Sequence, residues 1–496
     1  MPWALAAERS WRFEVDAAGP GVASTFPAEG ARDAALTGAI VLEFSEPLAP
    51  SSVNAYSIEL SDLSQAIPAS LSVQGATVTL VPSVALQPGR SYRVSVRGSV
   101  ADALGNPMGT AFELNFMTDQ GRFAYPVRLA PAISTDAMAI GDVNGDGMAD
   151  VVLTSGMADA PADESALFVA AGRADGSLGT PARTGAGRFL SCWLTSVAIG
   201  DLDGDGRNEV VVGGNGCGAA VFRQGSGGSL VLASLLNRAD MARVRLADLD
   251  GDGRAELLGG SLASDQLSIW RQNAAGELVL HATPGLGATG AADFEVADVN
   301  GDGRPDLVAA VSGSYVAVLR QQADGSFAAP DRLATDNSWG GPQGIAVGDL
   351  NGDGRKDVVI AAGGNWPNAY IGVFHQRSDG SLGPMSRMAS HDIPLAVRVA
   401  DLDGDGRADV IVSHQGWMKA GIYLQQADGT LAAEELFIAP YGNFNPHSMA
   451  VGDVNRDGRP DIALAGELLL QKPGTNPLTR LAPSRWRTLS GSPGAK

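Results

Sequence analysis

Residues 197–212 read VAIGDLDGDGRNEVVV, which is a short apolar run, an acidic loop rich in glycine, and a second apolar run. The pattern Asp-x-(Asn/Asp)-x-Asp-Gly-x-x-(Asp/Glu) occurs seven times in the 496-residue chain, at intervals of 59, 47, 50, 51, 52 and 52 residues. A period near fifty residues is typical of a propeller blade. The seven copies begin at Asp142, Asp201, Asp248, Asp298, Asp349, Asp401 and Asp453.

Each repeat predicts four strands. The apolar runs around the acidic loop indicate two buried strands, and a third, such as residues 315–319, ends at a glycine turn such as Asp324-Gly325-Ser326. A looser fourth strand follows in every repeat except the last. A matching segment precedes the first motif, so we expect a strand near 123–130 to complete the last blade and close the ring. Residues 122–472 are therefore predicted to form a seven-bladed β-propeller.

The acidic loops predict calcium sites. They place oxygen-bearing side chains at positions 1, 3, 5 and 9, with glycine at position 6 for a sharp turn, and hard cations prefer such oxygen ligands. An EF-hand would need Glu at position 12, where the first loop has Leu153, and flanking helices in place of strands. The alternative interpretation is that these are solvated turns without metal.

Up to seven Ca²⁺ are expected, and we expect them to be structural because seven ions would change the net charge from −20 to −6. The residue at position 7 would contribute its carbonyl oxygen. The predicted metal residues at positions 1, 3, 5, 7 and 9 are, loop by loop, Asp142, Asn144, Asp146, Met148, Asp150; Asp201, Asp203, Asp205, Arg207, Glu209; Asp248, Asp250, Asp252, Arg254, Glu256; Asp298, Asn300, Asp302, Arg304, Asp306; Asp349, Asn351, Asp353, Arg355, Asp357; Asp401, Asp403, Asp405, Arg407, Asp409; and Asp453, Asn455, Asp457, Arg459, Asp461.

Residues 197–207 and 347–355 resemble FG-GAP/VCBS repeats, the type also found in integrin α-subunit propellers. The resemblance covers about 350 residues. It implies a calcium-stiffened propeller used mostly in adhesion, ligand binding and surface assemblies, with enzymes a minority. The seventh loop departs from the pattern at Arg456, because the other six loops have glycine at position 4. This departure puts a charge beside the seventh site.

Residues 12–118 lack the motif and contain short alternating strands separated by turn signals, which predicts a β-sandwich. The stretches Phe44-Ser45-Glu46-Pro47-Leu48 and Asp102-Ala103-Leu104-Gly105-Asn106-Pro107 resemble the bacterial Ig-like domain of S-layer type. That resemblance implies a spacer or an adhesive module, and we assign no chemistry to it.

The two ends of the chain carry little structural signal. Residues 1–11 are interpreted as a leader whose Ala4-Leu5-Ala6 resembles the cleavage site of a longer export signal, the alternative being the leader of a cytoplasmic protein. Residues 473–496 are expected to be disordered.

A net charge of −20 argues against nucleic acid or an anionic membrane surface as a partner. No run of about 18 apolar residues occurs, so the sequence predicts no membrane span. The export-signal interpretation and the family resemblance lead us to expect a secreted or cell-surface protein.

A ligand face is predicted opposite the calcium loops, where the loops before the first strand and after the second strand of each blade lie. The partner would be a glycan or a protein, because aromatic rings with polar neighbours suit sugar stacking or peptide contact. The alternative is that these rings plug the mouth of the propeller. The candidate ligand residues are Trp193, Trp339, Trp366, His391, His414, Trp417, Tyr441 and His447, with Phe189, Tyr370 and Phe444 on the same face.

The two cysteines lie at similar distances on either side of the second acidic loop. Cys192 is 13 residues before Asp205 and Cys217 is 12 after it, so a hairpin would bring them opposite each other. A disulfide is expected in an oxidising compartment, and two free thiols are the alternative.

Three functions remain open from the sequence. The first is a calcium-dependent adhesion or carbohydrate-binding module. The second is a polysaccharide lyase or hydrolase that uses His391, His414 or His447 as base, and the third is a purely structural surface scaffold. No Gly-x-Ser-x-Gly elbow, zinc spacing or phosphate loop occurs in the sequence, so an enzyme is the less favoured interpretation.

Overall fold

The computed structural model divides the chain into two compact units, Met1–Gly121 and Arg122–Lys496. The predicted leader, and the predicted tail from residue 474 on, lie outside the described residues. No helix within the described ranges is long and apolar enough to cross a membrane. The residues described are 17–129, 135–155, 166–184, 192–238, 240–313, 315–335, 341–362, 364–365, 367–415, 418–440 and 445–473.

The first unit is the predicted β-sandwich. Alternate residues are buried along its strands because successive side chains point to opposite faces. The buried ones, among them Leu42, Val94 and Leu114, form one apolar core. One sheet has the order β1 (Val22–Phe26), β2 (Ile40–Phe44), β6 (Thr77–Pro82), β5 (Ala69–Gln74); the other has the order β4 (Ala66–Ile67), β3 (Ile58–Ser61), β7 (Ser91–Val96), β8 (Phe112–Met117), and a 3-10 helix η1 covers Pro50–Ser52.

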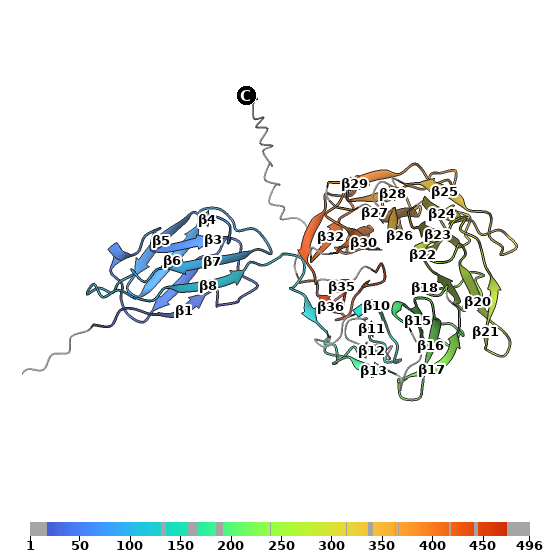
Figure 1. Cartoon of the computed structure of the whole chain (residues 1–496), viewed down its shortest axis with the longest axis horizontal. Helices are drawn as coiled ribbons and strands as arrows, with labels where there is room; N and C mark the ends of the chain where they lie inside the picture. Colours follow the sequence, from blue (N-terminus) through green and yellow to red (C-terminus); the bar gives the residue numbers. More distant parts are fainter. Residues whose placement is uncertain are drawn as a thin grey trace, which may run out of the picture. The chain divides into compact units, whose positions relative to one another are not determined.

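The second unit confirms the predicted seven-bladed propeller. Its described strands form seven four-stranded antiparallel sheets, which Figure 1 shows in a ring in chain order. The blades, each from its first to its fourth strand, are β10 (Thr135–Gly141), β11 (Asp150–Ser155), β12 (Leu167–Ala170), β13 (Ala182–Thr184); β14 (Leu194–Gly200), β15 (Glu209–Gly214), β16 (Gly218–Gln224), β17 (Leu230–Leu236); β18 (Arg243–Ala247), β19 (Glu256–Gly260), β20 (Ser268–Gln272), β21 (Leu278–Ala282); β22 (Ala291–Ala297), β23 (Asp306–Val311), β24 (Tyr315–Leu319), β25 (Asp331–Ala334); β26 (Pro342–Gly348), β27 (Asp357–Ala362), β28 (Tyr370–Phe374), β29 (Ser386–Ala389); β30 (Pro394–Ala400), β31 (Asp409–His414), β32 (Lys419–Tyr423), β33 (Glu435–Ile438); and β34 (Met449–Gly452), β35 (Asp461–Leu464), β36 (Glu467–Leu469), β9 (Val127–Arg128).

Neighbouring blades are joined by apolar seams. Every residue of β23 and β27 is buried, because a blade lies on each side of these strands, whereas the outermost β21 is mostly exposed. In the described part of the chain one cluster of buried apolar side chains spans each of the seven seams. The cluster that joins the seventh blade to the first contains Leu468 and Val151.

The ring closes as predicted, through a strand from before the first blade. In this closure β9 pairs with β36, and the Ala124 N–H donates to the Leu470 carbonyl at 2.8 Å. Phe123 is fully buried and forms an isolated bridge with Gln471. The strand expected over 123–130 is therefore shorter than predicted. Pro126 lies between the bridge and β9, and it has no N–H to donate to a ladder.

Candidate metal centres

Each acidic loop joins the first and second strands of a blade and is folded around its first aspartate. One carboxylate oxygen of that residue accepts the N–H of position 4 at 2.6 to 2.8 Å in six loops. The other oxygen accepts the N–H of position 6 at 2.7 to 2.9 Å in all seven. Glycine at position 4 has φ between 74° and 82°, the left-handed region that favours glycine. Arg456 holds φ 62° at this place in the seventh loop.

The acid at position 9 begins the second strand and is buried in every loop. One of its oxygens accepts the N–H of position 2, as in Glu209 with Leu202 at 2.7 Å. Burial and the nearby loop carboxylates together raise the pKa of Glu209 to about 7 and those of Asp306, Asp409 and Asp461 to about 6. A bound cation would favour the ionised form of these groups, because it supplies the missing opposite charge.

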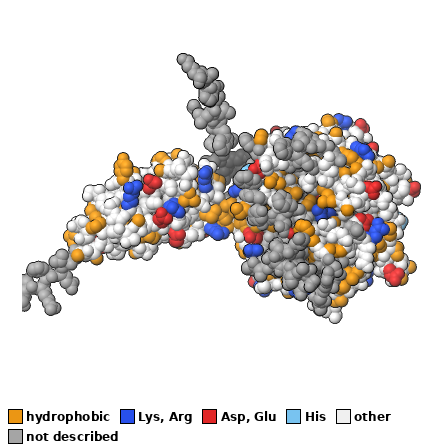
Figure 2. Space-filling view, viewed as in Figure 1, with side chains coloured by type: hydrophobic (Ala, Val, Ile, Leu, Met, Phe, Trp, Pro, Cys, Tyr) orange, Lys and Arg blue, Asp and Glu red, His pale blue; other side chains and the backbone are white. Residues whose placement is uncertain are grey.

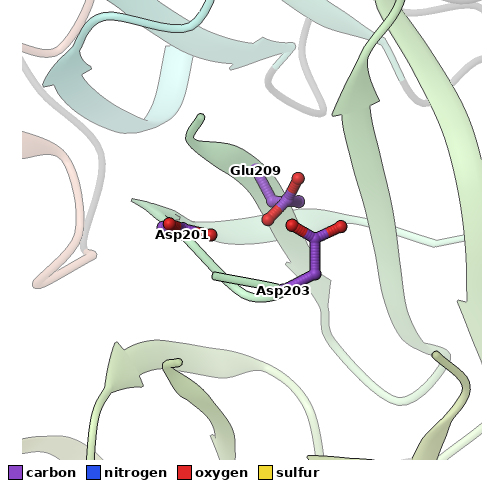
Figure 3. A group of neighbouring side chains, drawn as sticks. All are labelled: Asp201, Asp203 and Glu209. Carbon is purple, nitrogen blue, oxygen red and sulfur yellow. The ribbon is translucent and has the colours of Figure 1, made fainter. Parts of the chain in front are cut away.

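Positions 1, 3 and 9 converge in three loops. Within each of these groups the carboxylate oxygens lie within 4.8 Å of one another, and Figure 3 shows the first group turned toward a common centre. The groups are Asp201, Asp203, Glu209; Asp248, Asp250, Glu256; and Asp401, Asp403, Asp409. The other four loops have Asn at position 3, in Asn144, Asn300, Asn351 and Asn455, whose amide oxygen is also a calcium ligand type.

Two buried atoms test whether these residues fit a cation. Oδ1 of Asp203 and Oδ1 of Asp403 are buried and accept no hydrogen bond. Buried carboxylate oxygens are normally satisfied, since an unpaired one is costly. A hard cation at the centre of the group would satisfy them, so the three acidic groups could bind metal ions such as calcium.

The carboxylate at position 5 has a partner that the sequence did not predict. In six loops the guanidinium at position 7 pairs with the carboxylate at position 5 of the same loop, as Arg207 does with Asp205 at 2.5 Å and Arg459 with Asp457 at 2.6 Å. The same pairing occurs in the loops of Arg254, Arg304, Arg355 and Arg407. None of the three groups found in the described residues includes a position-5 carboxylate. The repeat pattern predicted a role for the carbonyl at position 7 but not for its side chain.

A glutamine also contacts the loops and was missed. Gln321 of the fourth blade donates its side-chain N–H to the Leu249 carbonyl in the third-blade loop at 2.9 Å. Gln425 and Gln471 make the matching bonds to the loops of the fifth and sixth blades at 3.0 and 2.8 Å. The signal was available, because six of the seven repeats place Gln just before the turn that follows the third strand. Each of these bonds ties one acidic loop to the next blade.

Only part of the predicted ligand face is described. Trp193 is 36% exposed, and its indole N–H donates to the buried carboxylate of Asp136. Tyr370 is buried in β28, so it cannot contact a ligand at the surface as predicted. Figure 2 shows acidic, basic and apolar side chains interspersed over the described surface in view. The predicted residues outside the described ranges are Phe189, Trp339, Trp366, Trp417, Tyr441 and Phe444.

His414 does not lie on an open face, which corrects its prediction as a ligand contact or base. Its side chain is fully buried, and Nε2 lies 2.7 Å from Oε1 of Glu434 while Nδ1 lies 3.1 Å from the Asp392 carbonyl. His391 is partly exposed and stacks edge-on against it, with ring centroids 5.4 Å apart. Both nitrogens of His414 are therefore committed to internal partners.

His447 is likewise internal, at 2% exposure. Its ring contacts the guanidinium of Arg245 at 2.9 Å and the carboxylate of Asp293 at 3.2 Å. Burial, with the positive charge of Arg245, lowers the pKa of His447 to about 3. His447 was predicted at the ligand face, but the folded chain encloses it because residues of three different blades meet there.

The cysteine pair closes the end of a hairpin. Cys192 and Cys217 form a disulfide, with Cα atoms 6.0 Å apart. They flank the last pair of the β14 and β15 ladder, Leu194 with Gly214, at the end opposite the acidic loop. The disulfide and the acidic loop thus tie the two ends of the same hairpin.

The ring of blades, with an acidic loop on the first hairpin of each, defines a β-propeller with repeated candidate metal loops. The chain belongs to the FG-GAP-like repeat family, whose model matches residues 142–212, 201–259, 248–309, 298–360, 349–412 and 401–464. Each match runs from one acidic loop through the next, so the six matches include all seven loops. Residues 16–118 match the bacterial Ig-like domain, which confirms that resemblance.

No curated protein matches the chain. Among solved structures, a protein from Lactobacillus plantarum is 18% identical over 62% of this chain and 86% of its own, with a TM-score of 0.45. BBS1N, solved in complex with ARL6DN, is 12% identical over 72% and 98%, with a TM-score of 0.48. A functionally unknown protein from Desulfotomaculum acetoxidans is 13% identical over 71% and 96%, with a TM-score of 0.42. These likenesses carry no argument about function.

Proposed function

We propose that this protein is a calcium-binding adhesion or ligand-binding protein that works outside the cell, with calcium as a structural ion in the blade loops. The observation that carries the proposal is the convergence of three carboxylates within 4.8 Å in three loops, two of which contain a buried oxygen without a partner. Oxygen-only donors in a flexible loop suit Ca²⁺ better than a softer metal. All seven loops would hold an ion.

Several features support a location at the cell surface or in the secreted fraction. A bacterial Ig-like domain precedes the propeller. The only two cysteines of the chain are joined as a disulfide, which persists in an oxidising compartment. The ligand would be a glycan or a protein, taken on the propeller face opposite the acidic loops, where exposed Trp193 is held by Asp136.

Two measurements test this proposal. Equilibrium dialysis of metal-stripped protein against ⁴⁵Ca²⁺ tests the metal; a protein that takes up no calcium at millimolar concentration contradicts the proposal. A glycan array, probed with and without a chelator, tests the ligand. Binding that is lost in Trp193→Ala but retained in Tyr56→Ala, which changes an exposed aromatic side chain of the Ig-like domain, would place a glycan on the predicted face. A blank array would turn the search to a protein ligand.

A further inference from the structure

The seven acidic loops are not equivalent, because two of them end in Glu instead of Asp. Glu209 and Glu256 occupy position 9 in the second and third blades. In the five Asp loops the second carboxylate oxygen accepts an N–H from the end of the third strand, as Asp306 does from Gln321 at 2.9 Å. Among the described contacts, neither Glu makes the corresponding bond.

An arginine stands across from each of these two glutamates. Phe222 pairs with Val210, so the next residue, Arg223, faces Glu209, and its guanidinium lies 3.6 Å from Asp203 at position 3. In the third blade Arg271 lies 3.3 Å from Asp250 and 3.2 Å from Glu256. Each arginine therefore puts its positive charge among carboxylates that would bind the metal.

The outer strand explains why these arginines turn toward the loop. Arg223 is paired with Val231 and Arg271 with Val279, which offer no charge. Arg320 occupies the same place in the fourth blade, but there the outer strand supplies Asp331, and Arg320 pairs with it at 3.4 Å. The same residue type is thus drawn to the loop in two blades and away from it in a third.

The two arginines are held by charge more than by hydrogen bonds. Nε of Arg223 and Nε of Arg271 are buried and donate to no acceptor, although Arg271 lies close to Glu256. Such a contact offsets part of the negative charge of the loop but leaves a donor unsatisfied. A divalent cation that entered the loop would have to displace the guanidinium or bind beside it.

We propose that Arg223 and Arg271 act as tethered counter-ions that lower the calcium affinity of the second and third loops below that of the sixth loop, which has the same number of carboxylates and Leu424 in place of the arginine. This inference rests on the proposed calcium binding. A unit positive charge within a few Å of the ion should weaken binding at least about tenfold, even with the screening found near a protein surface. The second and third sites would therefore bind calcium more weakly than the sixth.

The test is a calorimetric calcium titration of the metal-stripped full chain. Arg271→Leu is the informative variant, because the sixth and seventh blades carry Leu424 and Leu470 at this place. We expect it to tighten one site at least about tenfold, and Arg223→Leu with Arg271→Leu to tighten two. Arg320→Leu is the matched control and should leave every affinity unchanged.

The reverse change guards against a variant that fails to fold. Leu470→Arg should weaken the site of the seventh blade by a similar factor, and circular dichroism and thermal unfolding report whether each variant is folded. Calcium binding by all variants with the same affinities as the wild type would overturn the role of the arginines while leaving the proposed function intact. Absence of calcium binding in every variant would overturn the proposed function itself.

Discussion

The Ig-like domain and the propeller are both antiparallel β structure, but different interactions hold them together. The Ig-like domain has one apolar core between two sheets, with alternate residues buried along each strand. The propeller spreads its apolar contacts over seven seams and places a buried carboxylate at the start of the second strand of each blade. The difference teaches that similar strands can share one apolar core or can pack in seven separate seams beside a repeated set of buried acids.

Calcium removal should produce the largest difference between the stabilities of the two domains. Each site occupied at a hundred times its Kd adds about 2.7 kcal/mol to the folded state, so several sites together would contribute on the order of 10 kcal/mol. Differential scanning calorimetry should show the propeller transition falling steeply in the presence of a chelator, while the transition of the Ig-like domain stays in place. Two transitions that respond alike would contradict the comparison.

A substitution in the core of the Ig-like domain should destabilise that domain and leave the propeller unchanged. Leu42 is fully buried in the sandwich core, so Leu42→Ala should cost the Ig-like domain about 3 kcal/mol through lost burial and a cavity. The propeller transition in the same calorimetric scan should not move. Val81→Ala, at an exposed position of the same sheet, is the control and should have little effect on either transition.

The pH dependence of the two domains should have opposite signs without metal. Hydrogen bonds from the Ser64 hydroxyl and from backbone N–H groups lower the pKa of Asp62 to about 2, so its contribution to the Ig-like domain is lost as pH falls from about 4 to 2. In the propeller, the raised pKa values of Glu209, about 7, and Asp306, about 6, mean that stability is lost as pH rises from about 4 to 7.

Thermal unfolding with a chelator at pH 2.5, 4.5 and 7.5 measures this contrast, and the transition of the Ig-like domain should be lower at pH 2.5 than at pH 4.5. The propeller transition should be lower at pH 7.5, and excess calcium should remove the difference. An unchanged propeller transition in the chelator would show that the buried loop acids do not control its stability.

The smallest effect concerns the seventh loop alone. Arg456→Gly should stabilise the propeller by about 1 kcal/mol, because a residue with a side chain is strained at φ 62° and glycine is not. Chemical denaturation with calcium present measures it. Gly404→Arg in the sixth loop is the reciprocal variant, since Gly404 has φ 74° at the same position, and it should destabilise by a similar amount.

The sequence predicted the blades, their number and the closing strand because a motif repeated at nearly constant spacing reports one local unit again and again. The same repetition predicted positions 1, 3 and 9 of the candidate sites. It could not predict where deviating residues meet. Arg245 and His447 are 202 residues apart and touch only because the ring brings the third and seventh blades together.

A comparison of the repeats position by position would have revealed part of that network. Three residues before the motif, four repeats have alanine, whereas the third, fourth and sixth have Arg245, Glu295 and Arg398. Arg245 pairs with Glu295 at 3.0 Å, and Arg398 interacts electrostatically with both of them. Charges at a place where other repeats have alanine indicate a contact between blades, but the direction of each side chain depends on the closed ring.

The closing strand also decides how the protein would carry mechanical load. The chain of the Ig-like domain enters the propeller at Arg122, so a pull on that domain reaches the ring first through Phe123 and the two-residue strand β9. The ladder there is short, but Phe123 is fully buried against Phe437 of the sixth blade, with ring centroids 5.3 Å apart. Under tension, the connection between the two domains would thus depend on the Phe123 side chain, which contacts two blades. The force needed to extract this side chain would set the load at which the ring opens.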